Sequence, residues 1–314
     1  MFIKKIFICL LLMFCKIAFA NNQKSLIVVL DWFVNPNHAP LFVAQQEGFF
    51  AKQGLKVKFI PPADTSEGEK MVAVNKADIA VSYQPALMYK VTTGLPLTRF
   101  ATLINTPLNT LVVLKNSSIY SIKDLKGKRI GFSVPGIDNI LLTTMLKSAE
   151  LNTSDIELIN VKFNLTQALL TDKIDGFTGG MRNFEPIVME LADKPVRTFY
   201  PEKYGFPLYE ELILVTNKNK INDPSLIKFT RALKQGIDYL QKNPQKSWQK
   251  FAANHPELNN TLNEKAWFLT LPYFARDPAK LDRTRYQNLA DFMYKEKLIT
   301  YVPTIDSYAL HLNI

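Results

Sequence analysis

The chain has 314 residues, of which 47% are hydrophobic, and a formal net charge of +10. This length is enough for two lobes with well-buried cores. The lysines are spread along the sequence, with the densest patch at residues 123–129. A nucleic-acid-binding protein would concentrate them on one element with interleaved aromatic residues. We therefore predict a solvated surface and no nucleic acid partner; attraction to an anionic membrane face is the alternative.

The first twenty residues have the three-part pattern of a secretory signal peptide. Lys4 and Lys5 precede an apolar run, and Ala18 and Ala20 stand at the two positions that a signal peptidase reads. The apolar run is too short for a transmembrane helix. We predict cleavage after residue 20 and a periplasmic location; the alternative is an uncleaved N-terminal anchor.

Both cysteines, Cys9 and Cys15, lie in this segment. After its removal the chain has no cysteine for a disulfide, a nucleophile or a thiolate metal site. Its net charge falls to about +7, because three lysines leave with the segment. No later run of eighteen apolar residues occurs, so we expect no membrane insertion after cleavage.

Short β-branched runs then alternate with segments of helical spacing. The runs that predict strands are 25–32, 55–60, 78–82, 110–114, 128–133, 156–161, 176–180 and 211–217. The segment from Pro40 to Gly54 predicts a helix, because a proline opens it and a glycine ends it. Strands that alternate with helices indicate parallel sheets, in which ligands bind beyond the carboxyl ends of the strands.

Two segments, 75–85 and 172–186, share one order of features: a turn, an Asp, a short strand, a polar and aromatic loop, and a Pro. This likeness fits two similar lobes that each aim one strand tip at a shared cleft. From Asp223 onward the pattern becomes helical, with Asp223 as the expected helix cap and Pro224 at the first helical position. We predict that this helical tail packs on the first lobe.

The predicted fold class is therefore α/β, with two parallel-sheet lobes around a ligand cleft and a helical C-terminal tail. The predicted domains are the signal peptide at 1–20, lobe 1 at 21–108 plus 212–314, and lobe 2 at 109–211. We expect the connections between the lobes near 107–112 and 206–213.

Motifs for catalysis are missing from the sequence. It has no G-x-x-x-x-G-K-S/T loop, no G-x-G-x-x-G after the first strand and no H-E-x-x-H pair. Residues 131–136 are not a G-x-S-x-G nucleophile elbow, because Pro135 occupies its fifth position. The isolated His255 and His311 are expected at the surface. We predict no catalytic residue, no metal and no cofactor.

Polar and aromatic residues follow the predicted strands instead, in a pattern that favours binding. Aromatic faces stack on flat rings, while amides and a carboxylate can recognise the ring edge. A free backbone amide group near a glycine at a helix start suits an anion or a carbonyl. The predicted ligand-binding residues are Trp32, Asn35, Asn37, His38, Ser82, Tyr83, Gln84, Gly136, Asn183, Glu185 and Tyr209.

Each of these residues also has a structural interpretation. The aromatic residues can pack in the core, and Asn37 and His38 can cap the helix that starts near Pro40. Glu185 can be a first-turn acid that the helix dipole favours. Because these residues follow several separate predicted strands, we favour a binding site over a purely structural role.

Four segments together resemble a known family: "LDWFVNPNHAPLFVAQQEGFF" (30–50), "DIAVSYQ" (78–84), "DLKGKRIGF" (124–132) and "GGMRNFE" (179–185). They are similar to the substrate-binding proteins of ABC importers for thiamine pyrimidine precursors. The same superfamily contains the yeast-type thiamine pyrimidine synthase. The resemblance covers nearly all of the chain after residue 20.

The resemblance implies a two-lobed periplasmic binding fold, type II-like, and an ABC permease as partner. It implies a pyrimidine ring stacked between Trp32 and Tyr83, with Asn37 and His38 in contact and Glu185 at the aminopyrimidine edge. We expect a monomer. The loop at 181–185 departs from the tryptophan-rich form of bacterial pyrimidine-binding proteins, which leaves the identity of the ligand open.

The alternative is the synthase, which in that family uses pyridoxal phosphate held by a Lys, a nearby His and a cysteine-rich motif. The present chain has Ser82 and Tyr83 where that Lys would follow the strand, and no His between residues 39 and 254. The sequence therefore favours a binding protein that is not an enzyme.

Overall fold

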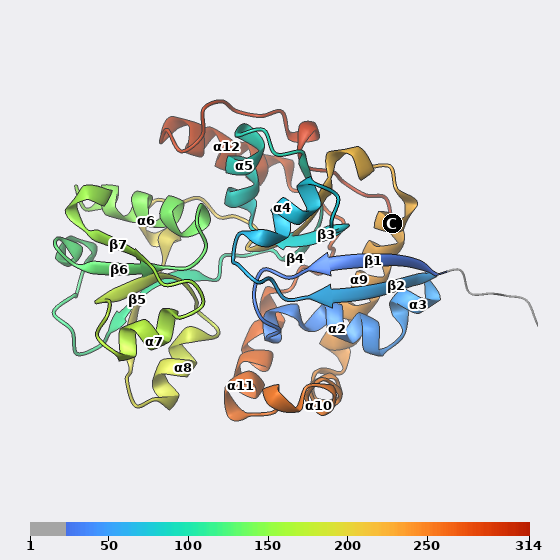
Figure 1. Ribbon diagram of the computed structural model, residues 1–314, viewed down its shortest axis with the longest axis horizontal. Coiled ribbons are helices and arrows are strands. Elements are labelled where there is room, and N and C mark those ends of the chain that lie inside the picture. Colours follow the sequence, from blue (N-terminus) through green and yellow to red (C-terminus); the bar gives the residue numbers. More distant parts are fainter. Residues whose placement is uncertain (1–22) are drawn as a thin grey trace, which may run out of the picture.

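The computed structural model describes residues 23–314, which form two α/β units side by side (Figure 1). The predicted signal peptide at residues 1–20, with both cysteines, lies outside the described residues. Within 23–314, no helix is both long enough and apolar enough to cross a membrane. The two-lobed α/β architecture that the sequence predicts is confirmed.

The first sheet has the strand order β2-β1-β3-β10-β4. Its strands are β1 (Lys24–Val29), β2 (Leu55–Ile60), β3 (Ile79–Ser82), β4 (Leu97–Ile104) and β10 (Leu212–Asn217). β1 runs parallel to β2 and β3, but β10 runs antiparallel to β3 and β4. β10 comes after the second unit in the chain, so it enters the first sheet in the opposite direction.

The second sheet has the order β7-β6-β8-β5-β9. Its strands are β5 (Asn109–Leu114), β6 (Arg129–Phe132), β7 (Glu157–Asn160), β8 (Gly176–Met181) and β9 (Val196–Phe199). β6 is parallel to β7 and β8, whereas β5 is antiparallel to β8 and β9. The prediction of parallel sheets is therefore wrong for β5 and β10. Each of these two strands follows directly after the other unit in the chain, and each runs antiparallel to both of its neighbours. Strands β1 to β4 and β10 lie within the ranges proposed for lobe 1, and β5 to β9 lie within the range proposed for lobe 2. The exact domain boundaries stay a prediction.

Eleven α-helices of residues 23–314 surround the sheets. They are α2 (Ala39–Gln46), α3 (Phe49–Lys52), α4 (Glu67–Ala73), α5 (Gln84–Thr92), α6 (Ile137–Ser148), α7 (Leu165–Leu170), α8 (Glu185–Leu191), α9 (Pro224–Lys242), α10 (Pro244–Asn254), α11 (Thr261–Thr270) and α12 (Arg283–Lys295). A short 3-10 helix at Pro36–His38 precedes α2.

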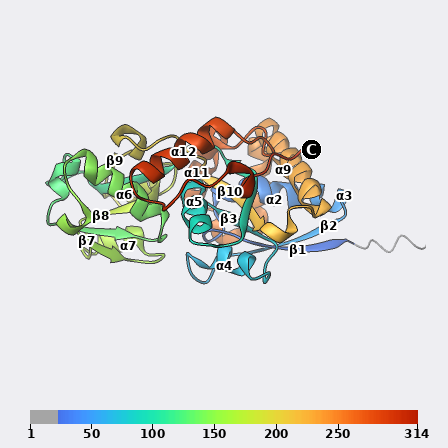
Figure 2. The same ribbon diagram turned by 90° about the horizontal axis from the view of Figure 1, so that it is seen from above.

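The C-terminal tail is helical and packs on the first unit, as predicted (Figure 1). Asp223 caps α9 by accepting the backbone N–H of Ser225 at 2.9 Å. α9 lies directly on α2, where a Cβ atom added to Gly236 would be 2.6 Å from the Pro40 carbonyl oxygen. Glycine at this position therefore allows the close approach of the two helices. Figure 2 shows α12 near the junction of the two units, where Glu296 pairs with Lys147 of α6 at 2.9 Å.

Two strands, β4 and β9, were not predicted from the sequence. All of β4 is buried, including Arg99, whose guanidinium donates to the Leu310 carbonyl at 2.8 Å. Arg99 interrupts the apolar run that would predict a strand. Its burial is possible because it is hydrogen-bonded to a residue far away in the sequence, and the local sequence gives no sign of that partner. β9 has only four residues and contains Arg197.

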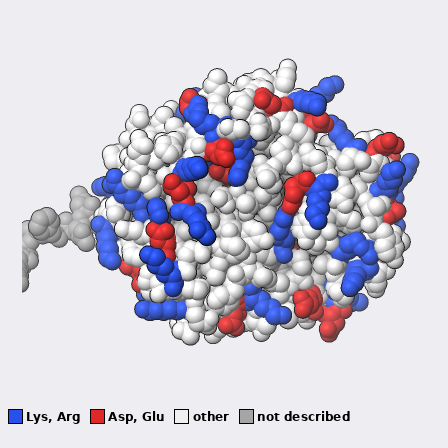
Figure 3. Space-filling model, turned by 180° about the vertical axis from the view of Figure 1, so that it is seen from behind, with Lys and Arg blue, Asp and Glu red and all other residues white. Residues whose placement is uncertain are grey.

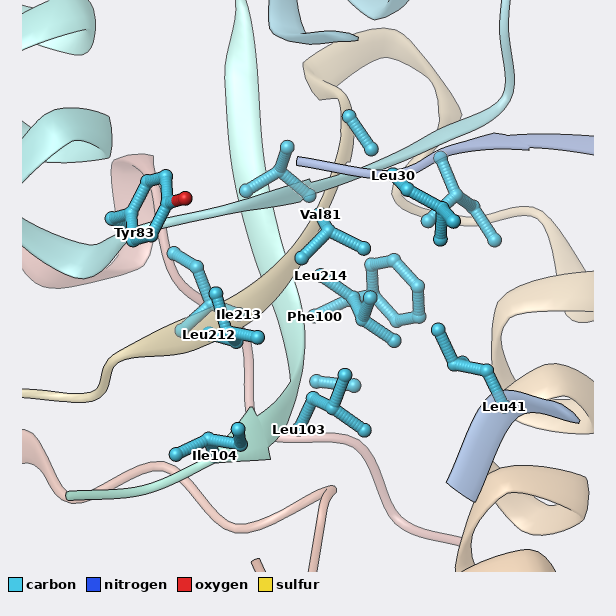
Figure 4. Close-up of a cluster of buried hydrophobic side chains, with 14 of the residues drawn as sticks. Leu30, Leu41, Val81, Tyr83, Phe100, Leu103, Ile104, Leu212, Ile213 and Leu214 are labelled. Carbon is cyan, nitrogen blue, oxygen red and sulfur yellow. The ribbon is translucent and has the colours of Figure 1, made fainter. Parts of the chain in front are cut away.

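A cluster of buried apolar side chains holds the first sheet against its helices (Figure 4). Leu30 and Val81 are no more than 2% exposed and lie close to the ends of β1 and β3. Packing of these two side chains therefore fixes the residues just beyond them, Asp31 and Tyr83. Both are placed at the carboxyl ends of neighbouring parallel strands, which is where sheets of this kind bind ligands.

Candidate ligand-binding site

A cavity lies between the two units and is lined by residues of both. Its empty space, counted together with the part that opens to solvent, is about 440 Å³. The first unit contributes Asp31, Trp32, Asn35, Asn37 and Tyr83, and the second contributes Val134, Leu165, Gly179, Met181, Phe184 and Glu185.

Asp31 is the centre of a hydrogen-bond network on the side of the first unit. Its Oδ1 lies 2.8 Å from His38 Nε2, and its Oδ2 accepts the Tyr83 hydroxyl at 2.7 Å. The other ring nitrogen, His38 Nδ1, accepts the backbone N–H of Asn35 at 3.4 Å, so Nε2 carries the proton donated to Asp31. His38 is fully buried and does not line the cavity. It supports Asp31 from behind.

This network sets the charge of Asp31 and Tyr83. Burial acts to raise the pKa of Asp31, but the hydrogen bonds from His38 and Tyr83 overcome it and hold that pKa below its usual value. Burial and the neighbouring Asp31 carboxylate raise the pKa of the Tyr83 hydroxyl well above its usual value. The cavity therefore contains a fixed carboxylate next to a neutral phenol.

The turn after β1 is shaped by its two amides. Asn35 caps the 3-10 helix Pro36–His38 by accepting the backbone N–H of Asn37 at 2.8 Å. Asn37 is turned toward the second unit, where its Oδ1 lies 2.7 Å from Nδ2 of Asn183. Asn183 Nδ2 also lies 2.6 Å from the Thr270 hydroxyl at the end of α11. One turn thus serves as helix cap, cavity wall and contact between the units.

Glu185 is the carboxyl group that the second unit brings to the cavity. It is the first residue of α8, and its Oε2 accepts the backbone N–H of Met181 at 2.6 Å. Its carboxyl group is enclosed, although the residue as a whole is partly exposed. Burial raises the pKa of Glu185 to about 7. Oε1 has no partner among residues 23–314, so it is available to a ligand.

A second buried carboxyl group, Asp138, lies behind the cavity wall. It accepts the backbone N–H groups of Ser133 and Val134, each at 2.8 Å. Burial raises its pKa to about 6. A Cβ atom added to Gly179 would be 2.5 Å from Asp138, and Gly179 has a φ of +95°. Glycine is therefore needed here on two counts, for backbone conformation and for space.

Of the residues predicted from the sequence, five line the cavity: Trp32, Asn35, Asn37, Tyr83 and Glu185. His38 and Asn183 contact lining residues from behind. The cavity residues outside the predicted set are Asp31, Val134, Leu165, Gly179, Met181 and Phe184. The sequence does point to Asp31 and Phe184, because each is adjacent in the chain to a predicted binding residue at the end of a strand.

The remaining four predicted residues lie elsewhere in this structure. The Ser82 hydroxyl donates to Glu69 at 2.8 Å, and Oε1 of Gln84 accepts the backbone N–H of Glu210 at 2.7 Å. The Tyr209 hydroxyl donates to Glu211 at 2.9 Å. Gly136, at the start of α6, lines a separate surface groove.

Comparisons with known proteins agree with this architecture. A family model described as NMT1/THI5 like matches residues 35–247. A Haemophilus influenzae protein whose name assigns it provisionally to thiamine biosynthesis is 46% identical over 297 residues, 94% of each chain. A Legionella pneumophila 4-amino-5-hydroxymethyl-2-methylpyrimidine phosphate synthase is 28% identical and covers 85% of each chain. A formylaminopyrimidine-binding protein of Halalkalibacterium halodurans is 28% identical over 78% of this chain and 76% of its own.

Solved structures show the same fold. The alkanesulfonate-binding protein of Xanthomonas axonopodis pv. citri, at 18% identity, superposes with a TM-score of 0.72 over 92% of this chain and 98% of its own. A Candida albicans protein described as having the generic periplasmic binding protein fold, at 17% identity, superposes with a TM-score of 0.74 over 93% of this chain and 97% of its own. The periplasmic binding protein fold that the sequence predicts is therefore confirmed.

Proposed function

Because the chain belongs to the NMT1/THI5-like family, we propose that it is a periplasmic solute-binding protein that delivers a small heteroaromatic ligand to an ABC permease. One observation carries this proposal: side chains from both units line a single cavity between them. Such an arrangement holds a ligand that both units contact, and release requires only that the units separate.

The lining favours a flat ring with polar edges. Trp32, Tyr83 and Phe184 supply aromatic faces on which a ring can stack. Glu185 offers a free carboxyl oxygen, and Asn37 offers an amide, so a ring with an amino group and a ring nitrogen can be recognised. We propose a thiamine pyrimidine precursor as ligand, either the hydroxymethyl or the formylaminomethyl aminopyrimidine. The name of the Halalkalibacterium relative supports this choice.

Binding would act by shifting the population of two arrangements of the units. A ligand that touches Trp32 in one unit and Glu185 in the other has its full set of contacts only when the units are together. It therefore stabilises the closed arrangement, which presents both units to the permease. The signal-peptide pattern at 1–20 supports a periplasmic location.

The face of the molecule shown in Figure 3 gives no support for a nucleic acid as partner. On the face shown in Figure 3, Lys and Arg side chains alternate with Asp and Glu side chains and do not gather into one basic region. A nucleic-acid-binding face needs a continuous basic patch.

The second candidate is a pyrimidine phosphate synthase, which the names of several relatives favour. A cofactor held as a Schiff base requires a lysine amine at the site. No lysine lines the cavity in the described part of the chain. Ser82, at the tip of β3, is buried against Glu69. These observations favour binding without catalysis.

Thermal melting of residues 21–314 tests the proposal. The panel is 4-amino-5-hydroxymethyl-2-methylpyrimidine, formylaminopyrimidine, thiamine and pyridoxal phosphate. A ligand at a hundred times its dissociation constant should stabilise the protein by about 2.7 kcal/mol. A shift with either pyrimidine supports the proposal. A shift with pyridoxal phosphate alone favours the synthase, and no shift with any compound rejects the ligand class.

A further inference from the structure

We propose that Asn37 presents only its NH2 group to the cavity, because a chain of hydrogen bonds that begins at the Ala266 carbonyl fixes the orientation of its amide. The consequence for the ligand rests on the proposed function: the atom that meets Asn37 must be a hydrogen-bond acceptor. We call the chain of Ala266, Thr270, Asn183 and Asn37 the amide relay.

The direction of the amide relay is set at its first bond. Thr270 Oγ1 lies 2.6 Å from the backbone carbonyl oxygen of Ala266, one turn earlier in α11. A carbonyl oxygen can only accept, so the single hydroxyl proton of Thr270 lies in this bond. Toward its next neighbour, the Asn183 side chain at 2.6 Å, the Thr270 oxygen must therefore accept.

The second and third bonds follow from the first. The group of Asn183 that faces Thr270 must be a donor, which makes it Nδ2. The same Nδ2 lies 2.7 Å from the side chain of Asn37. An amide NH2 group cannot accept, so the atom of Asn37 that faces it must be Oδ1. The 3.5 Å between Thr270 Oγ1 and Asn37 Oδ1 is too long to compete with the shorter bonds.

The orientation of Asn37 leaves its Nδ2 free. This nitrogen makes no hydrogen bond to any residue of the range 23–314, and Asn37 lines the cavity. Asn183 Oδ1 is buried without a partner among the described residues. If the Asn183 amide were reversed, Nδ2 would be the buried atom without a partner in place of Oδ1. The unpartnered atom therefore does not determine the direction of the hydrogen bonds in the relay. The Ala266 carbonyl determines it.

The amide relay joins the two units, since Asn183 precedes α8 in the second unit and its partners belong to the first. Asn37 and Asn183 are 6% and 2% exposed, and Thr270 is fully buried, so water does not replace these bonds. The donor is therefore fixed only when the units are closed. A ring nitrogen with a lone pair satisfies Asn37, while Glu185 Oε1 accepts the N–H of an amino group.

A matched pair of variants tests the amide relay without changing a cavity residue. Thr270→Ser keeps the hydroxyl, whereas Thr270→Val keeps the shape and removes it. Affinities are measured for 4-amino-5-hydroxymethyl-2-methylpyrimidine and for two analogues in which one ring nitrogen is replaced by C–H. In the wild type, one replacement should weaken binding about tenfold or more, the value of one hydrogen bond to an otherwise unpaired donor.

The decisive quantity is the ratio between the affinity for the pyrimidine and the affinity for the analogue that lacks the ring nitrogen. We call this ratio the preference for the ring nitrogen. Thr270→Ser should keep the tenfold preference, and Thr270→Val should reduce it to about threefold or less, because Asn37 can then turn either way. A variant that is only less stable binds both compounds less well and keeps their ratio. If Thr270→Val retains the full preference, or if both variants lose it equally, the relay does not orient Asn37.

A measurement on the ligand-free wild type separates this inference from the proposed function. In NMR spectra, contacts between the rings of Trp32 and Phe163, whose centroids are 4.7 Å apart, report the closed arrangement of the units. Where these ring contacts are present, the NH2 protons of Asn183 should show contacts with the Thr270 methyl group, and those of Asn37 should not. The reverse pattern, or the absence of both amide contacts while the ring contacts are present, would overturn the amide relay. Failure of the pyrimidine to bind the wild type would instead reject the proposed ligand, whatever the NMR result.

Discussion

The indole of Trp32 in the first unit packs edge-on against Phe163 of the second, with ring centroids 4.7 Å apart and an interplanar angle of 67°. Phe163 lies between β7 and α7, and Phe33 packs on it with a centroid distance of 4.7 Å. Trp32 lines the cavity, so the orientation of this wall depends on a residue of the opposite unit. Stacking on Trp32 and closure of the units are therefore coupled.

Phe163→Ala should weaken pyrimidine binding about three- to tenfold, because it removes an aromatic pair of about 0.5–1.5 kcal/mol that exists only in the closed arrangement. The loss should appear mainly as faster dissociation in stopped-flow fluorescence. Tyr301→Ala is the control, since Tyr301 is 49% exposed and does not line the cavity. Equal effects of the two variants would show that Phe163 does not position Trp32.

Asp31→Asn should destabilise the protein by about 1–3 kcal/mol, because one buried donor loses its acceptor. The carboxylate accepts from both His38 and Tyr83, whereas an Asn side chain has one acceptor and must turn its NH2 toward one of these donors. Urea unfolding at pH 7 measures the change.

Asp64→Asn is the control for this variant. Asp64 is an exposed loop residue that accepts the backbone N–H of Ser66 at 3.0 Å, so the same substitution there should change stability little. Equal stability of the Asp31 and Asp64 variants would mean that the network around Asp31 is not a stabilising element.

Ligand affinity should rise between pH 6 and pH 8. Burial raises the pKa of Glu185 to about 7, and only the carboxylate form has two oxygens that accept N–H groups. The rise should not exceed about tenfold per pH unit, the limit for one titrating group. Glu185→Gln should bind more weakly and should lose the pH dependence in isothermal titration. A pH dependence that persists in this variant would assign it to another group.

Stability of the ligand-free protein should fall as the pH rises from 5 to 8. Burial raises the pKa of Glu185 and Glu211 to about 7 and that of Asp138 to about 6. The folded state therefore holds protons that the unfolded chain has already released above about pH 4.5. Each such group contributes a loss of up to about 1.4 kcal/mol per pH unit, and the loss ends once the folded group has ionised.

Urea unfolding at pH 5, 6, 7 and 8 measures this trend. Glu185→Gln should reduce the slope between pH 5 and pH 7, because one of the three groups no longer titrates. A stability that rises over this range in the wild type would contradict the buried, proton-binding state of these carboxyl groups.

The sequence correctly predicts a cavity residue where the side chain just after a strand is directed toward the cavity. Trp32, Asn37, Tyr83 and Glu185 reach the cavity because each follows a strand of the appropriate sheet. Ser82, next to Tyr83 in the chain, points to Glu69 instead, because neighbouring side chains in extended backbone face opposite sides. A window of adjacent residues cannot separate these two outcomes.

The rest of the site depends on contacts between distant segments. Val134 and Leu165 look like core residues in the sequence, and only the approach of the two units makes them cavity walls. Arg99 hides β4 for a related reason, since its partner carbonyl belongs to Leu310 near the end of the chain. The mixed direction of the sheets also follows from long-range connectivity and not from the local pattern of β10 or β5.

Isothermal titration of residues 21–314 with 4-amino-5-hydroxymethyl-2-methylpyrimidine and formylaminopyrimidine tests the central claim most directly. We predict that at least one of the two compounds binds with one ligand per chain. Glu185→Ala should make the free energy of binding less favourable by about 1–3 kcal/mol. If neither compound binds, or if Glu185→Ala binds as tightly as the wild type, the cavity between Trp32 and Glu185 is not an aminopyrimidine site.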